Sequence, residues 1–135
     1  MSEGEGARKS FYSEEVERLA RDNEDFRRVL YTAQHTQIVL MAIPPGEEIG
    51  EETHDGTDQV LAFVAGEGEA VIEGKRSPVR AGSLCVVPSG TRHNFTAGAG
   101  SPLKLFTVYS PPEHPDCTVH RTKAEADEYE REHHH

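Results

Sequence analysis

The middle of the chain consists of short apolar runs in which every second side chain points the same way. Residues 37–43 (QIVLMAI), 59–65 (QVLAFVA) and 103–109 (LKLFTVY) are examples, and residues that favour turns, chiefly Gly, Pro and Asp, separate the runs. Six or more short strands at this kind of spacing, with no helical pattern between them, are typical of an antiparallel sandwich or barrel. The pattern therefore predicts an all-β core.

Helical patterns occur only near the two ends. Val16 and Leu19 recur at helical spacing after Ser13, which predicts a short helix over EEVERLARDN with Ser13 as its cap. Thr122 and Glu125 form a Thr-x-x-Glu capping box that predicts a second helix over KAEADEYERE. The predicted organisation is an N-terminal helical or extended arm (1–34), a β-barrel (35–112) and a C-terminal loop and helix (113–135).

Composition limits the classes of partner. A chain of 135 residues fits one domain, and its 24 acidic and 14 basic residues give a net charge of −10. This charge disfavours surfaces that neutralise nucleic-acid phosphates or meet anionic lipid. The sequence has no apolar run long enough for a membrane span and no signal-peptide pattern at its start, so we expect a cytoplasmic protein.

Two other composition features bear on the search for a site. Cys85 and Cys117 are too few for a disulfide framework and lack the C-x-x-C spacing of zinc ribbons and redox pairs. The closing His133 to His135 are either the remnant of a purification tag or native residues, and in both cases they are set aside when metal ligands are sought.

Candidate chemistry lies first in EETHDGTDQ, residues 51–59. Glu52 and His54 are two positions apart, so on a strand their side chains leave the same face, about 7 Å apart along the chain. A turn after His54 would bring Gln59 back beside them. A second segment, GSLCVVPSGTRHNF, uses its Pro-Ser-Gly turn to present His93.

These segments resemble the small single-domain cupins, which are jelly-roll or double-stranded β-helix proteins that hold one metal inside the barrel. The spacing of the family's two motifs is matched by Gly46, Glu52, His54, Gln59 and Gly66, and by Gly82, Pro88, Gly90 and His93. The resemblance covers roughly residues 40–109. It implies a single cupin barrel, flanked here by the short N- and C-terminal helices.

The ligand set departs from the family pattern. Where the family usually has His, His, Glu and His, this chain has Glu52, His54, Gln59 and His93, and Ala97 stands where the second motif ends in Asn. The change keeps one carboxylate and replaces an imidazole by an amide oxygen.

The resemblance therefore implies one divalent transition metal, with Glu52, His54, Gln59 and His93 as ligands. A set of two His and one carboxylate with open positions suits Mn²⁺, Fe²⁺, Co²⁺, Ni²⁺ or Zn²⁺. The alternative is that the acid and amide are polar turn residues and that both histidines are hydrogen-bonded barrel residues without an ion.

Strand alternation predicts which residues lie around such a metal. The pocket candidates are Gln37, Met41, Phe63 and Phe106. The candidate proton donors or bases are Tyr109 and His35, although Tyr109 also fits a strand-end packing role and His35 a place on the rim.

The fold does not select one reaction, because cupins include dioxygenases, isomerases, lyases and proteins that only bind small molecules. We expect a metal-dependent enzyme, dioxygenase-like or isomerase-like, acting on a small carbonyl or enediol substrate that donates oxygen to the metal. One alternative is a non-catalytic small-molecule-binding or sensor protein. Another is a sugar-phosphate isomerase, although the inner strands show no Arg or Lys pair to clamp a phosphate. The family resemblance also implies a homodimer.

Overall fold

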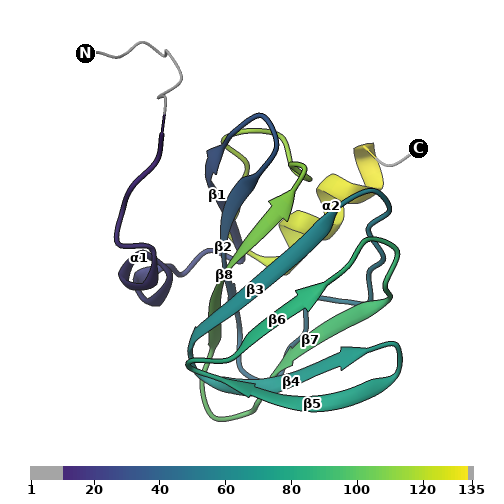
Figure 1. The fold of residues 1–135 in the computed structure, drawn as a ribbon. Coiled ribbons are helices and arrows are strands. Elements are labelled where there is room, and N and C mark those ends of the chain that lie inside the picture. Colours follow the sequence, from purple (N-terminus) through teal and green to yellow (C-terminus); the bar gives the residue numbers. More distant parts are fainter. Residues whose placement is uncertain (1–10, 134–135) are drawn as a thin grey trace.

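The computed structural model describes residues 11–133, which form two antiparallel β-sheets and two short helices (Figure 1). The elements are α1 (Val16–Asp22), β1 (Arg27–Thr32), β2 (Gln37–Ile43), β3 (Asp58–Ala65), β4 (Glu67–Ile72), β5 (Lys75–Arg80), β6 (Leu84–Val87), β7 (His93–Ala97), β8 (Leu103–Ser110), β9 (Val119–His120) and α2 (Lys123–His133). The predicted all-β fold with a short helix near each end is confirmed.

The larger sheet has the strand order β6-β3-β8-β2-β1-β9, and the smaller one has the order β5-β4-β7. Apolar side chains from both sheets meet between them. Phe63 of β3 and Phe95 of β7, for example, are both buried and have ring centroids 5.6 Å apart. Isolated bridges, Glu48 with Thr96 and Glu52 with His93, tie the segment before β3 to β7. The result is a flattened barrel with a continuous core.

Side-chain alternation along β8 decides what faces this core. Leu105, Thr107 and Tyr109 are buried and point inward. Phe106 points to the opposite face, where it packs against the cluster of Ala20 and Leu40 beneath α1. The expectation that Phe106 lines the pocket is therefore wrong, because the strand places it on the outside of the sheet.

The helix ends follow the sequence in one case only. Thr122 Oγ1 accepts a hydrogen bond from Glu125 N at 3.1 Å, so Thr122 caps α2 as predicted. Helix α1 begins at Val16, with Glu15 at the capping position and no side-chain cap bond. Ser13 is therefore not the cap that the sequence predicted.

Strand β1 belongs to the larger sheet, where it pairs with β2 on one side and with β9 on the other. The boundary predicted after residue 34 thus falls in the turn between β1 and β2. After β8, a loop returns over Gln37, whose side chain is fully buried. Gln37 Oε1 accepts hydrogen bonds from the backbone N of Glu113 and of His114, each at 3.1 Å, and its Nε2 donates to His114 O at 2.7 Å. Gln37 therefore holds this loop in place.

No helix within residues 11–133 is long and apolar enough to cross a membrane. In the same part of the chain both cysteines, Cys85 and Cys117, are free thiols.

Candidate metal centre

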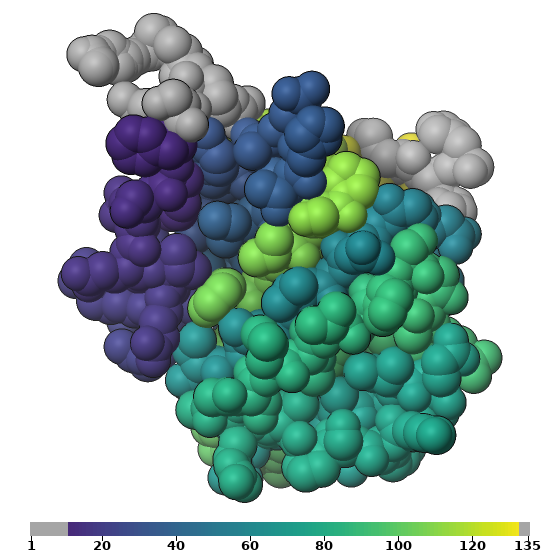
Figure 2. Space-filling view, in the orientation of Figure 1, coloured from purple at the N-terminus to yellow at the C-terminus, as the bar shows by residue number. Residues whose placement is uncertain are grey.

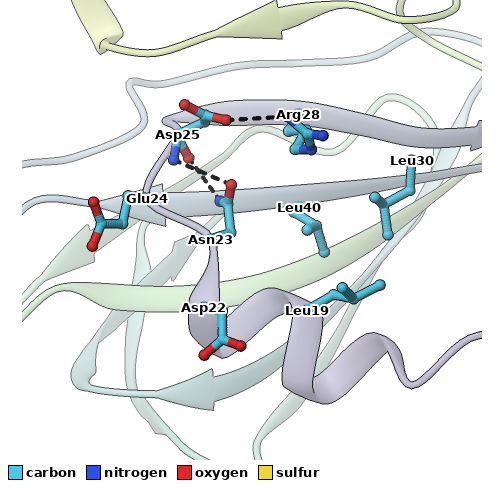
Figure 3. Close-up of a pocket in the computed structure, with 8 residues that line it drawn as sticks. All are labelled: Leu19, Asp22, Asn23, Glu24, Asp25, Arg28, Leu30 and Leu40. Carbon is cyan, nitrogen blue, oxygen red and sulfur yellow. Dashed lines mark hydrogen bonds and ion pairs between the residues drawn. The ribbon is translucent and has the colours of Figure 1, made fainter.

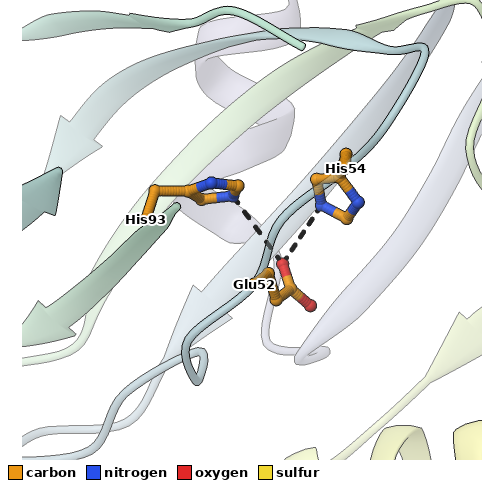
Figure 4. A group of neighbouring side chains, drawn as sticks. All are labelled: Glu52, His54 and His93. Carbon is orange, nitrogen blue, oxygen red and sulfur yellow. Dashed lines mark ion pairs between the residues drawn. The ribbon is translucent and has the colours of Figure 1, made fainter. Parts of the chain in front are cut away.

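Glu52, His54 and His93 converge at the closure between the two sheets (Figure 4). Glu52 and His54 lie in the segment before β3, and His93 is the first residue of β7. One ligand atom from each residue lies within 4.8 Å of the other two. The carboxylate of Glu52 points between the two imidazole rings, which is the arrangement of three ligands around a common ion.

His93 is oriented by a backbone carbonyl. Its Nδ1 lies 2.8 Å from Thr91 O, and because a carbonyl only accepts, Nδ1 must carry the proton. In the neutral ring the lone pair is therefore on Nε2, which is buried, has no hydrogen-bond partner and lies 4.0 Å from Glu52 Oε1. A histidine whose second nitrogen is fixed in this way is typical of a metal ligand.

His54 lies between two carboxylates. Its Nε2 is 3.2 Å from Glu52 Oε1, and its Nδ1 is 3.1 Å from Glu113 Oε2. The approach of Nε2 to Glu52 lacks the alignment of a hydrogen bond, so this nitrogen also has no hydrogen-bond partner. Burial would lower the pKa of His54, but Glu113 and Glu52 outweigh it and raise the pKa to about 9. Without a metal, the positive charge on His54 takes the place of a cation beside Glu52.

The carboxylate of Glu52 stays ionised at this site. Burial would raise its pKa, but His54, Arg27 and His93 together lower it below the usual range. The negative charge needed to hold a divalent cation is thus present at neutral pH.

Gln59, the predicted fourth ligand, is buried near the start of β3. Thr107 Oγ1 donates to Val60 O at 2.8 Å, so it must accept from Gln59 Nε2, which lies 3.0 Å away. This chain of hydrogen bonds fixes the orientation of the carboxamide. Gln59 Oε1 is left buried and without a partner, so it remains an available oxygen donor.

Among the other predicted catalytic and pocket residues, some lie near the centre and others do not. Tyr109 is buried with its ring 5.8 Å from that of His54, and burial raises its pKa, so its phenol stays protonated and can donate but not act as a base. His35 is exposed in the turn between β1 and β2. Met41 and Phe63 belong to the packed core, and Gln37 holds the loop.

Two residues beside this centre were not found from the sequence. Glu113 lies in a proline-rich loop that the sequence does not place, and it reaches His54 only because Gln37 holds the loop. Arg27 is 4% exposed and lies in the segment predicted as a separate arm. A basic residue in the inward register of an apolar strand was the one available signal for Arg27.

The donor set fits a divalent transition metal. Two imidazole nitrogens, each buried and without a hydrogen-bond partner, face one ionised carboxylate, and an unpartnered amide oxygen is available from Gln59.

A hollow of about 420 Å³ beneath α1 lies elsewhere on the molecule (Figure 3). Three of its polar residues, Asn23, Asp25 and Arg28, pair with one another. Asn23 exchanges hydrogen bonds with the backbone of Asp25, and the carboxylate of Asp25 lies 3.5 Å from Arg28. The other two carboxylates, of Asp22 and Glu24, are exposed, and the hollow has no histidine, so it is not comparable to the centre at Glu52.

Comparisons of sequence and of structure with known proteins agree on one family. A family model described as "Cupin domain" matches residues 39–109. The crystal structure of BH2720 from Bacillus halodurans superposes with a TM-score of 0.85 and 36% identity over 89% of this chain and 95% of that one.

Two curated proteins are similar in sequence. The uncharacterized protein YrkC of Bacillus subtilis is 42% identical over 118 residues, which cover 82% of this chain and 63% of YrkC. The oxalate-binding protein of Thermotoga maritima is 31% identical over 79 residues, which cover 56% of this chain and 65% of that protein. The chain thus spans slightly less than two thirds of the length of these curated relatives.

Proposed function

The chain belongs to the cupin family, and on that premise we propose that Glu52, His54 and His93 hold a divalent transition metal to which a small molecule binds through oxygen donors. The observation that carries this proposal is the pair of buried Nε2 atoms of His54 and His93, which have no hydrogen-bond partner and face one carboxylate. Without a metal, the proton on His54 offsets part of this cost through the ion pair with Glu52, whereas His93 Nε2 stays unsatisfied unless an ion binds it.

Each residue has a defined part in this site. His54 and His93 supply neutral nitrogen donors, and Glu52 supplies the negative charge. Gln59 contributes a weaker oxygen donor as the fourth ligand. The set suits Mn²⁺, Fe²⁺, Co²⁺, Ni²⁺ or Zn²⁺ and leaves coordination positions for a ligand. When bound, such an ion polarises a coordinated carbonyl or enolate oxygen.

The neighbouring groups favour ligand binding as the basic function. Tyr109 stays protonated and can donate a hydrogen bond to a ligand oxygen, but it cannot remove a proton. The oxalate-binding relative supports a small molecule that offers oxygen atoms.

Catalysis on a carbonyl or enediol substrate is the second candidate function, and Glu113 favours it. This carboxylate is partly exposed and lies beside the site without belonging to the three-ligand group, which is where a general base would act. Sugar-phosphate isomerisation remains less favoured, because Arg27 is the one buried Arg or Lys side chain among residues 11–133.

Metal content tests the proposed function. Elemental analysis should be made in a background in which His133, His134 and His135 are alanine, so that these residues cannot bind metal. After stripping and reloading, we expect about one metal per chain, and almost none in the His54→Ala, His93→Ala double variant. His35→Ala, which changes an exposed histidine, is the matched control. Equal metal content in the double variant and the control would overturn the proposal.

A second experiment distinguishes the two candidate functions. Manganese- and iron-loaded protein would be incubated with diketones, enediols and flavonols while oxygen uptake and product masses are followed. Turnover that is lost in Glu113→Gln at unchanged metal content would support catalysis with Glu113 as the base, and binding without turnover across the panel would support a binding protein.

A further inference from the structure

We propose that Arg27 forms an anion-binding site for the ligand of the metal centre and that this ligand is therefore a small carboxylate. This inference rests on the proposed metal-binding function and names the class of ligand that the site takes.

Arg27 is directed into the barrel by the register of β1. It pairs with Met41 of β2 and with His120 of β9. Along β1, Arg27 and Val29 are buried whereas Arg28 between them is exposed, so Arg27 faces the interior. Its side chain is only 4% exposed, which is rare for an arginine that lacks an ionic partner.

The guanidinium has no counter-charge in the part of the chain that the structure describes. Among residues 11–133, no carboxylate lies within 4.0 Å of it, and its buried Nε has no hydrogen-bond partner. The ring of Phe26 lies 5.3 Å away and gives only a weak cation–π contact. Burying an unpaired charge is costly, so an anion from outside the chain would remove a real penalty.

The charge of Arg27 reaches the metal centre. It helps to lower the pKa of Glu52, against the effect of burial, and it opposes the rise that burial causes in the pKa of Tyr109. Burial and the Arg27 charge together lower the pKa of His114 to about 3 and also lower that of His120. Both histidines are thus neutral at pH 7 and can donate one N–H each.

The unpartnered buried atoms divide into two chemically opposite sets. His93 Nε2 and Gln59 Oε1, together with His54 Nε2 once a metal has displaced its proton, offer lone pairs, which suit a cation. The second set is Arg27 Nε, His114 Nε2 and His120 Nδ1. Arg27 Nε can only donate, and each of the two histidine nitrogens becomes a donor in one tautomer, so this set suits an anion. A metal with a negatively charged ligand would satisfy both sets together.

The charge balance also favours a carboxylate as the ligand. When a divalent cation is bound, the two carboxylates of Glu52 and Glu113 offset its charge, and the charge of Arg27 remains uncompensated. One guanidinium matches one carboxylate, with which it can form two parallel hydrogen bonds. A carboxylate that carries a neighbouring oxygen donor would meet both the arginine and the metal, whereas a neutral enediol would leave Arg27 unpaired.

The test compares an acid with its neutral amide. In the background without His133 to His135, the protein would be loaded with Co²⁺, whose visible spectrum reports both metal binding and ligand binding. Glycolate and glycolamide, which differ mainly in charge, are then titrated into the wild-type protein, Arg27→Gln and Arg28→Gln. Arg28 is the matched control, because it is exposed and adjacent in sequence.

We expect Arg27→Gln to weaken glycolate binding roughly tenfold to a hundredfold and to leave glycolamide binding unchanged, with no change in Arg28→Gln. Equal glycolate affinity in Arg27→Gln and the wild type would overturn the proposal, as would equal binding of glycolate and glycolamide by the wild type. A missing cobalt spectrum before any ligand is added would instead contradict the proposed metal site, so the two failures are distinguishable.

A second readout does not need a stable Arg27→Gln variant. In zinc-loaded wild-type protein, the Nε–H resonance of Arg27 should shift when glycolate is added and not when glycolamide is added. Arg27→Lys, which keeps the charge, assigns the resonance through its loss. A resonance that does not respond to saturating glycolate would overturn the proposal.

Discussion

Glu52 and His93 exchange both of their backbone hydrogen bonds, with Glu52 N to His93 O at 2.8 Å and His93 N to Glu52 O at 2.9 Å. In an antiparallel bridge of this kind, opposed side chains leave the same face about 5 Å apart. Two of the candidate ligands are therefore positioned by the backbone that joins the segment before β3 to β7. Because this bridge also closes the barrel, the site is held by the fold itself and not by a free loop.

The first prediction concerns Glu113, whose Oε2 lies 3.1 Å from His54 Nδ1. If His54 binds the metal through Nε2, its Nδ1–H donates to Glu113, which orients the ring and raises its basicity. We expect Glu113→Ala to weaken metal binding roughly tenfold to a hundredfold, and Glu113→Gln, which keeps an acceptor, to weaken it less.

Competition with a chelator of known affinity would measure this effect. Glu51→Gln is the matched control, since Glu51 is also a carboxylate near the site but pairs with Arg92 at 2.9 Å. Metal affinities that are the same for Glu113→Ala and Glu51→Gln would show that Glu113 does not position His54.

The second prediction is that metal binding releases a proton. In the metal-free protein Glu113 and Glu52 overcome the effect of burial and raise the pKa of His54 to about 9, so this residue is protonated at pH 7. A ligating imidazole must be neutral, and binding therefore displaces that proton. We expect release of about one proton per metal at pH 7 and an affinity that rises roughly tenfold per pH unit up to about pH 9.

Calorimetry in buffers of different ionisation enthalpy gives the number of protons directly. The same pKa has a consequence for the metal-free fold. The stabilisation that the fold gains from protonated His54 is complete below the unfolded pKa of 6.5 and is lost as the pH rises through about 9. Binding without proton release at pH 7 would contradict the assignment of His54 as a ligand.

The sequence predicted the parts of the structure that depend on local pattern. Strand alternation and the spacing of Gly46, His54, Gly66 and His93 were enough for the all-β fold and for the family. The face on which Phe106 lies was not predictable in this way, because both faces of β8 carry apolar and polar side chains. Only the register of β8 with β2 and β3 decides which face turns inward.

Arg27 and Glu113 show a different limit. Each reaches the site through contacts between segments that are far apart in the chain. Arg27 depends on the pairing of β1 with β2 and β9, and Glu113 depends on the hydrogen bonds of Gln37 to its loop. Local propensity carries no information on either contact, so a single sequence could not bring these two residues to the centre.

The third prediction concerns Gly66, which occupies a motif position and has φ of +85°. A Cβ added here would collide with the backbone carbonyl of Pro102, whereas at Gly46, with φ of +75°, it would meet nothing within 4 Å. We expect Gly46→Ala to lower the free energy of unfolding by about 1 kcal/mol through backbone strain alone. Gly66→Ala should lower it by roughly 3 kcal/mol or more, because overpacking adds to the strain.

Urea denaturation of the two variants would measure the difference. Gly46→Ala serves as the control for positive φ. The additional loss in the free energy of unfolding of Gly66→Ala therefore measures the cost of the clash with Pro102 alone. Equal losses in both variants would mean that the backbone at Pro102 moves away at little cost.

The fourth prediction is a homodimer through the outer face of the larger sheet. Leu84 and Val86 on the edge strand β6 are 64% and 58% exposed, and Figure 2 shows β3, β6 and β8 reaching the surface on this face. A net charge of −10 makes two copies repel, so contact is favoured where the surface is apolar and uncharged.

Light scattering after gel filtration would measure the mass. We expect a dimer for the wild-type chain and a monomer for the Leu84→Glu, Val86→Glu variant. Val119→Glu is the control, since Val119 is an exposed apolar residue on β9, at the other edge of the sheet. A wild-type monomer at all concentrations tested would contradict this prediction.

The last prediction concerns Gln59 as the fourth ligand. Thr107 donates its hydroxyl proton to Val60 O and can only accept from Gln59 Nε2, so the amide oxygen must turn away from Thr107. Gln59→Leu should lower metal affinity several-fold, because a weak neutral ligand is lost, whereas Gln59→Glu should raise it, because a carboxylate adds charge beside the dication. Thr107→Val removes the group that fixes the amide and should produce part of the loss seen in Gln59→Leu. Unchanged affinity in all three variants would show that Glu52, His54 and His93 bind the metal without Gln59.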